Sequence, residues 1–146
     1  MTALVVRLLF PVALVVGAAL VAKGYAQIGD GFSGGAAAGL GALLPYVALE
    51  RREAARLVGA RAAWKLVGGG LVLALAVALA PVFTGRAPVW HLPRPDAHVA
   101  RFGVLELHTA LLFDLGVAAL VYGALVATFD RLFPPQDEAA EREDRA

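Results

Sequence analysis

The chain contains no cysteine, and it carries little charge for its length. Charged residues occupy 17% of 146 positions, and the formal net charge is +1 at pH 7. The absence of cysteine excludes disulfides, thiolate metal sites and cysteine-ligated iron–sulfur clusters within this chain. A net charge so close to zero argues against nucleic-acid binding through a basic surface. The three histidines leave little material for a haem or a metal cage, so the sequence predicts neither a cofactor nor a metal site.

Hydrophobic residues, by contrast, make up 60% of the chain. Soluble domains average roughly 45–50% apolar residues and about 25% charged ones. A soluble fold of this size has too little interior to bury so much apolar surface. We therefore expect a multi-pass protein of the inner (cytoplasmic) membrane of a cell.

Four apolar segments each come near the roughly 20 residues that cross about 30 Å of hydrocarbon. They cover residues 3–22, 32–49, 64–83 and 107–129. The predicted fold is an all-α integral membrane protein, a four-helix bundle formed by residues 1–132. Residues 133–146 contain two consecutive prolines followed by a charged run, which predicts a disordered cytoplasmic tail.

Basic residues predict how this bundle is oriented. With both termini in the cytoplasm, nine basic residues lie inside and four outside, so the positive-inside rule favours that orientation. The inner set is Arg7, Arg51, Arg52, Arg56, Arg61, Lys65, Arg131, Arg142 and Arg145. The arginine-rich loop over residues 50–63 is interpreted as a topology signal in contact with lipid headgroups, or as a docking site for a partner.

Asp114 lies inside the apolar core of the last segment. A carboxylate at that depth costs several kcal/mol unless it is protonated, paired or hydrated. It is either a titratable site or cation contact, or a group that holds a neighbouring helix or another chain by a polar contact. Glu106 and His108 begin the same segment, and they either extend a polar route toward Asp114 or contact lipid headgroups at the interface.

The second segment opens with a glycine-rich stretch. Gly35 and Gly39 form a small-xxx-small pair, which lets helix backbones approach closely in lipid. The glycines before that pair permit a tight turn. Asp30 adds a carboxylate at this outer turn, where it would attract cations. The stretch is interpreted either as helix packing plus a turn or as a polar re-entrant turn beside an ion path.

Three motifs resemble those of the MnhB/MrpB family. Residues 24–35 are similar to a signature turn that usually reads G-H-x-x-P-G-G-G-F-x-G-G, with Tyr25, Ile28 and Asp30 as departures. Residues 108–117 are similar to a last helix that usually reads T-P-x-L-F-D-x-G-V, with Ala110 in place of proline. Residues 7–11 resemble the family's opening, and the order and spacing of all three motifs agree.

This resemblance implies the MrpB component of an Mrp-type multisubunit Na⁺/H⁺ antiporter, which would be an accessory membrane protein without covalent chemistry. Its implied partners are large complex-I-like antiporter subunits, other small subunits, Na⁺, H⁺ and lipids. Asp114 matches the family's acidic position in the last helix. The residues that match the turn are Gly31, Phe32, Gly34 and Gly35. Two alternatives remain: the same module in a membrane-bound hydrogenase or other complex-I-like redox-driven pump, and a purely structural scaffold subunit.

Overall fold

The structure is a computed structural model that describes residues 1–23, 30–85, 101–102, 105–106 and 109–133. Apart from two short strands, the regular elements of these residues are helical, as predicted. They are α1 (Thr2–Lys23), α2 (Asp30–Gly41), α3 (Leu43–Ala48), α4 (Arg51–Leu57), η1 (Ala60–Ala62), α5 (Ala63–Leu79), η2 (Ala80–Thr84), β1 (Arg101–Phe102), β2 (Leu105–Glu106) and α6 (Thr109–Leu132). The strands pair antiparallel, with Arg101 opposite Glu106.

Four helical stretches of the described residues are long and apolar enough to cross a membrane, which confirms the number predicted. They are Thr2–Lys23, Asp30–Ala48, Ala60–Phe83 and Thr109–Leu132. The second stretch starts two residues earlier than predicted and is divided into α2 and α3. Pro45 explains the division, because proline has no N–H to donate to a helical carbonyl. The chain keeps turning there because the Ala42 N–H lies 3.1 Å from the carbonyl oxygens of both Ala38 and Gly39.

The predicted loop over residues 50–63 is itself folded, as α4 and η1. Ala54 and Val58, one turn apart on this hairpin, are buried in a core cluster that includes Phe10 and Val126. Gly59 then adopts a left-handed conformation (φ 74°), which a helix end readily takes at glycine. The hairpin therefore covers one end of the helices instead of extending into solvent.

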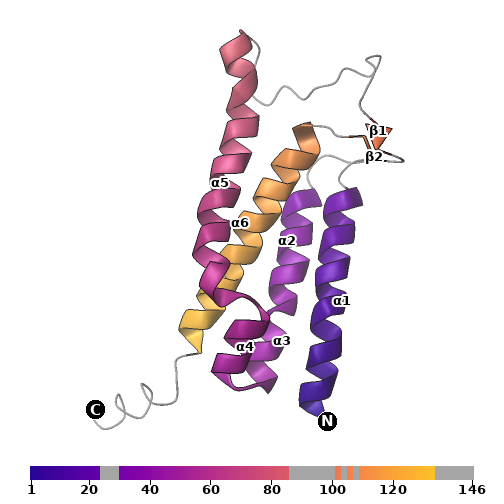
Figure 1. Cartoon of the computed structure of the whole chain (residues 1–146), viewed down its shortest axis with the longest axis vertical. Helices are drawn as coiled ribbons and strands as arrows, with labels where there is room; N and C mark the ends of the chain where they lie inside the picture. The colour runs from indigo at the N-terminus through magenta and orange to yellow at the C-terminus, as the bar shows by residue number, and fades with distance from the viewer. Residues whose placement is uncertain (24–29, 86–100, 103–104, 107–108, 134–146) are drawn as a thin grey trace, which may run out of the picture.

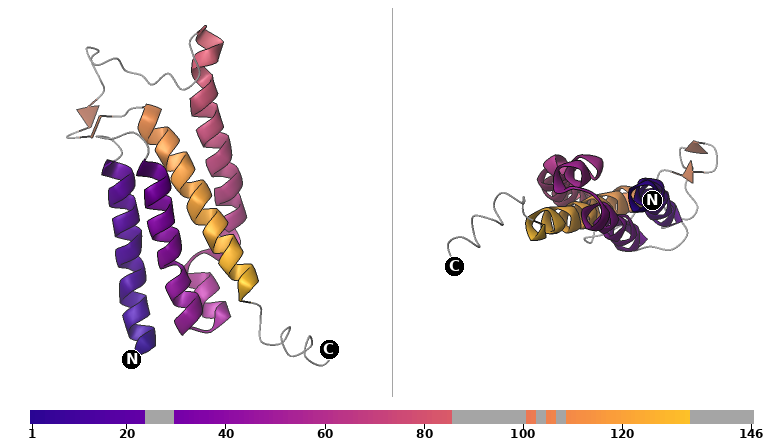
Figure 2. Two further views of the ribbon diagram at one scale, coloured as in Figure 1. Left: turned by 180° about the vertical axis from the view of Figure 1, so that it is seen from behind. Right: turned by 90° about the horizontal axis from the view of Figure 1, so that it is seen from below.

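The four spans are arranged as a row rather than as a closed bundle (Figures 1 and 2). α2 packs between α1 and α6, and α5 packs chiefly on the other side of α6. Each span is apolar around most of its circumference, so the hydrophobic pattern alone does not determine which faces meet. The first residues of α1, the α3–α4 hairpin and the last residues of α6 lie at the same end of the row (Figure 1).

Glycines set the close spacing within this row. A Cβ added at Gly35 would lie 2.6 Å from the Ala118 carbonyl oxygen on α6, and one at Gly34 would lie 2.6 Å from the Gly17 carbonyl oxygen on α1. The α5–α6 contact has the same form, because a Cβ at Gly116 would lie 2.9 Å from the Ala74 nitrogen. Backbone therefore packs on backbone at all three seams, as small residues permit in lipid.

Gly35→Ala tests this close helix spacing. The added methyl group forces α2 away from α6, and we expect the free energy of unfolding to fall by about 1–3 kcal/mol. Thermal unfolding of the full chain in detergent measures the effect.

Gly69→Ala is the matched control, because a Cβ at Gly69 meets nothing within 4 Å. In the interior of α5 this substitution should be neutral or should stabilise by up to about 1 kcal/mol, given the helix propensity of alanine. Equal unfolding midpoints for the two variants would contradict close α2–α6 packing.

Candidate functional site

Asp114 lies at the seam between α6 and α2. It is the fifth residue after Thr109, about 7 Å along α6 from the start of the helix, and only 2% of the residue is exposed. Gly31 on α2 packs against its backbone, since a Cβ added at Gly31 would come within 2.6 Å of the Asp114 Cα. The missing side chain of Gly31 therefore allows α2 to cover this stretch of α6.

Two carboxylate oxygens at this seam have no hydrogen-bond partner within the described part of the chain. They are Oδ2 of Asp114 and Oδ2 of Asp30, and both atoms are buried. Asp30 directly precedes Gly31 in sequence, so both acids belong to the same end of the α2–α6 contact. A buried polar atom without a partner costs about 1–3 kcal/mol, and more if it is charged. A proton, a cation, water or a donor from another protein chain would remove that cost.

The predicted glycines of α2 divide between two neighbours. Gly31, Gly35 and Gly39 are spaced four residues apart and lie against α6, where a Cβ added at Gly39 would come within 3.1 Å of the Leu125 Cβ. Gly34 lies against α1. The stretch forms the first turns of a helix, so the re-entrant turn proposed from the sequence is not present among residues 30–41.

Phe32 is 62% exposed and lies outside the packed seams. Glu106 belongs to β2, where it pairs with Arg101 of β1 in the strand register. His108 lies outside the described residues, as do His91 and His98, so a polar route from the start of α6 toward Asp114 stays a prediction. Within the described ranges, no three His, Cys, Asp or Glu residues come together as a metal cluster.

A second polar contact, which the sequence did not predict, joins three elements at the opposite end of α6. The Tyr46 hydroxyl of α3 donates to Oδ1 of Asp130 at 3.2 Å. Nη2 of Arg51 on α4 donates to Oδ2 of Asp130 and to its main-chain carbonyl, both at 3.2 Å. The only sequence signal was an acid at the end of the last span and arginines in the preceding loop, and no local rule pairs residues 79 positions apart.

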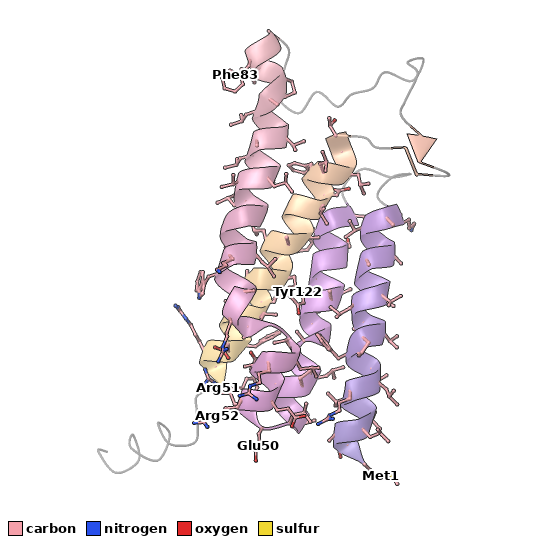
Figure 3. All side chains as sticks on the ribbon, in the orientation of Figure 1. Met1, Glu50, Arg51, Arg52, Phe83 and Tyr122 are labelled. Atoms are coloured by element: carbon pink, nitrogen blue, oxygen red, sulfur yellow. The ribbon has the colours of Figure 1, made fainter. Side chains whose placement is uncertain are left out.

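Further contacts hold the α4 hairpin to the spans. The Tyr122 hydroxyl of α6 donates to the Val58 carbonyl oxygen at 2.8 Å, which anchors the end of α4. Figure 3 shows Tyr122 on α6 near this hairpin. Arg7 of α1 forms an exposed ion pair with Glu53 of α4. The hairpin is therefore fixed to both α1 and α6.

Comparison with known proteins agrees with the family suggested by the sequence motifs. A family model described as "Domain related to MnhB subunit of Na+/H+ antiporter" matches residues 1–127. A relative from Rhizobium meliloti (strain 1021), whose name describes a probable K⁺/H⁺ antiporter component of combined A/B type, is 34% identical over 127 residues. The matched region covers 85% of this chain and only 12% of that relative.

The contact between Arg51 and Asp130 can be measured by a double-mutant cycle. Arg51→Gln and Asp130→Asn should each lower the unfolding midpoint in detergent, because each substitution leaves the other group without its ionic partner. Both side chains are 31% exposed, so solvent screens the pair, and we expect a coupling energy of about 0.5–1 kcal/mol. A coupling energy of zero would show that the two residues act independently.

Proposed function

The chain belongs to the family related to the MnhB subunit of Na⁺/H⁺ antiporters, and from this we propose that it is an accessory membrane subunit of a multisubunit cation/proton antiporter. The relative from Rhizobium meliloti carries the matching sequence within a much longer polypeptide, of which this chain spans 12%. That relation supports a place beside a larger membrane protein. The chain itself performs no covalent chemistry and lies in the cytoplasmic membrane.

The observation that carries this function is the buried, unpartnered oxygen of Asp114 within a span. An acid retained in a membrane helix marks an ion pathway, a proton relay or a polar contact between helices. A contact within this chain would give both carboxylate oxygens a donor, and Oδ2 has none among the described residues. Asp114 therefore exchanges a proton or contacts a cation along the route of the assembled complex.

Asp30 supports the same function from the adjacent helix. Its Oδ2 is the second buried acceptor without a partner at this seam, within the described ranges. Two acids that face low-dielectric surroundings at one end of a helix pair would attract cations toward that end. Because α2 covers Asp114 through Gly31, ions would reach it from the end of the seam rather than across the lipid face.

Asp114→Asn tests the transport role. The amide keeps the size of the side chain but does not ionise at neutral pH, so we expect Na⁺/H⁺ and K⁺/H⁺ exchange to fall on the order of tenfold or more. Exchange is measured in everted membrane vesicles from cells that lack their own antiporters, and the assembled complex is quantified in the same membranes.

Asp130→Asn is the matched control, because it removes a carboxylate from the same helix about 24 Å away. That acid is already held by Tyr46 and Arg51, so its loss should reduce stability or assembly and leave the exchange per assembled complex unchanged. Normal exchange by an assembled Asp114→Asn complex would refute the transport role. Loss of assembly alone would assign Asp114 to the scaffold.

Both termini are proposed to face the cytoplasm, because the arginine-rich hairpin lies at the same end as the start of α1. The chain lacks cysteine, so Thr2→Cys introduces a single reporter. A membrane-impermeant maleimide should label it in inside-out vesicles and not in intact cells. Pro88→Cys, in the segment between the third and fourth spans, should show the reverse, and labelling of Thr2→Cys in intact cells would contradict this orientation.

A further inference from the structure

A cavity of about 610 Å³ lies at the end of the molecule that carries α4. Four arginines and one acid contribute to its lining: Arg51, Arg52, Arg56, Arg61 and Asp130. Figure 3 shows Arg51 and Arg52 at this end of the molecule. The volume falls within the ~300–1,000 Å³ that is typical of ligand pockets, so the space is large enough for a small polar group.

The positive charge of this cavity is not neutralised by the described part of the protein. Four arginines against one aspartate leave a formal charge of +3 on the lining. The aspartate, Asp130, is held by Arg51 and Tyr46. The remaining three, Arg52, Arg56 and Arg61, are exposed and form no ion pair with any acid of the described ranges. These three guanidinium groups are therefore available to an anion from outside the chain.

The hairpin holds these side chains around one space. Arg52 and Arg56 are four residues apart on α4, and so share one face of that helix, while Ala54 and Val58 direct another face into the core. The left-handed turn at Gly59 then reverses the chain, and Arg61 on η1 lines the same cavity. The arginines thus converge from both arms of a packed hairpin.

The cavity lies where the membrane-spanning stretches end. Its arginines fall between the spans Asp30–Ala48 and Ala60–Phe83 or at the first residues of the latter, and Asp130 belongs to the last turn of Thr109–Leu132. Large apolar side chains beside these residues in sequence are exposed, namely Leu57, Trp64 and Leu132. A ligand with an anionic head and an apolar body fits this combination of charge and exposed hydrophobic surface.

We propose that this cavity binds the phosphate group of an anionic phospholipid from the adjoining leaflet. Guanidinium groups present pairs of N–H donors in a planar fork that matches phosphate oxygens. Basic pockets among membrane helices at the cytoplasmic side bind anionic headgroups in the same way. The phosphate lies between Arg52, Arg56 and Arg61, and the acyl chains run along the exposed apolar surface beside them.

The test is retention of phosphatidylglycerol by the full chain, measured by native mass spectrometry after release from nanodiscs of phosphatidylglycerol and phosphatidylcholine in equal parts. The unmodified chain should retain phosphatidylglycerol in preference to phosphatidylcholine. The variant Arg52→Gln/Arg56→Gln should retain about tenfold less or below, since it loses charge-assisted hydrogen bonds to the phosphate.

The control variant Lys65→Gln/Arg131→Gln removes two positive charges near the same end without touching the cavity lining, and it should retain the lipid. Equal losses in the two variants would overturn the proposal, because general attraction to an anionic surface would then explain the binding. Arg52→Lys/Arg56→Lys keeps the charge but loses the fork, and an intermediate retention supports direct phosphate contact.

Two further measurements separate other occupants of the cavity. Soluble glycerol phosphate that displaces phosphatidylglycerol at equal concentration would assign the cavity to a free phosphate compound and overturn the lipid assignment. Lipid retention that appears only after removal of the acidic residues 134–146 would assign it to the chain's own tail. Should the double variant fail to fold, Arg61→Gln tests the same site from η1, and unchanged retention there would contradict the proposal.

Discussion

The approach of α2 to α6 is the constraint on which the rest of the structure depends. Three glycines spaced four residues apart remove the side chains that would hold the two helices apart. The contact buries Asp114, which would otherwise face hydrocarbon at a cost of several kcal/mol. The same helix directs Gly34 toward α1, so α2 binds both of its neighbours through missing side chains. Packing and the placement of the acid are therefore one feature of the chain rather than two.

The two ends of the row have different chemistry. The end where α2 and α6 begin contains Asp30 and Asp114, each with a buried oxygen that lacks a partner among the described residues. At the other end, Asp130 has partners for both of its oxygens, and the excess of charge is positive. Satisfied polar groups rigidify a structure, whereas unsatisfied ones await a ligand or another protein chain. This contrast is why the proposed transport role is assigned to Asp114 and not to Asp130.

Much of this arrangement was predictable from the sequence, because its signals are local. The four spans follow from the length of the apolar runs, and the packing face of α2 follows from the spacing of Gly35 and Gly39. The burial of Asp114 was predicted because no other environment tolerates a carboxylate at that depth. The family was suggested by motifs at both ends of the chain, and the comparison over residues 1–127 agrees with it.

The remaining features depend on contacts that are distant in sequence. The residues of α4 read as a charged loop, since a seven-residue helix is stabilised by packing rather than by its own propensity. Its anchors, Tyr122 and Asp130, lie 64 and 79 positions away from the groups they bind. The row of helices was likewise unpredictable, because apolar helices offer no polar face that would distinguish a row from a closed bundle.

A density map of the assembled complex in a lipid environment tests the central claim most directly. We expect the Asp114 side chain to lie at the α2–α6 seam beside Gly31, with its unpartnered oxygen contacted by water, a cation or a donor from a neighbouring protein. A map in which that carboxylate faces acyl chains, or in which α2 stands a full side chain away from α6, would contradict this claim.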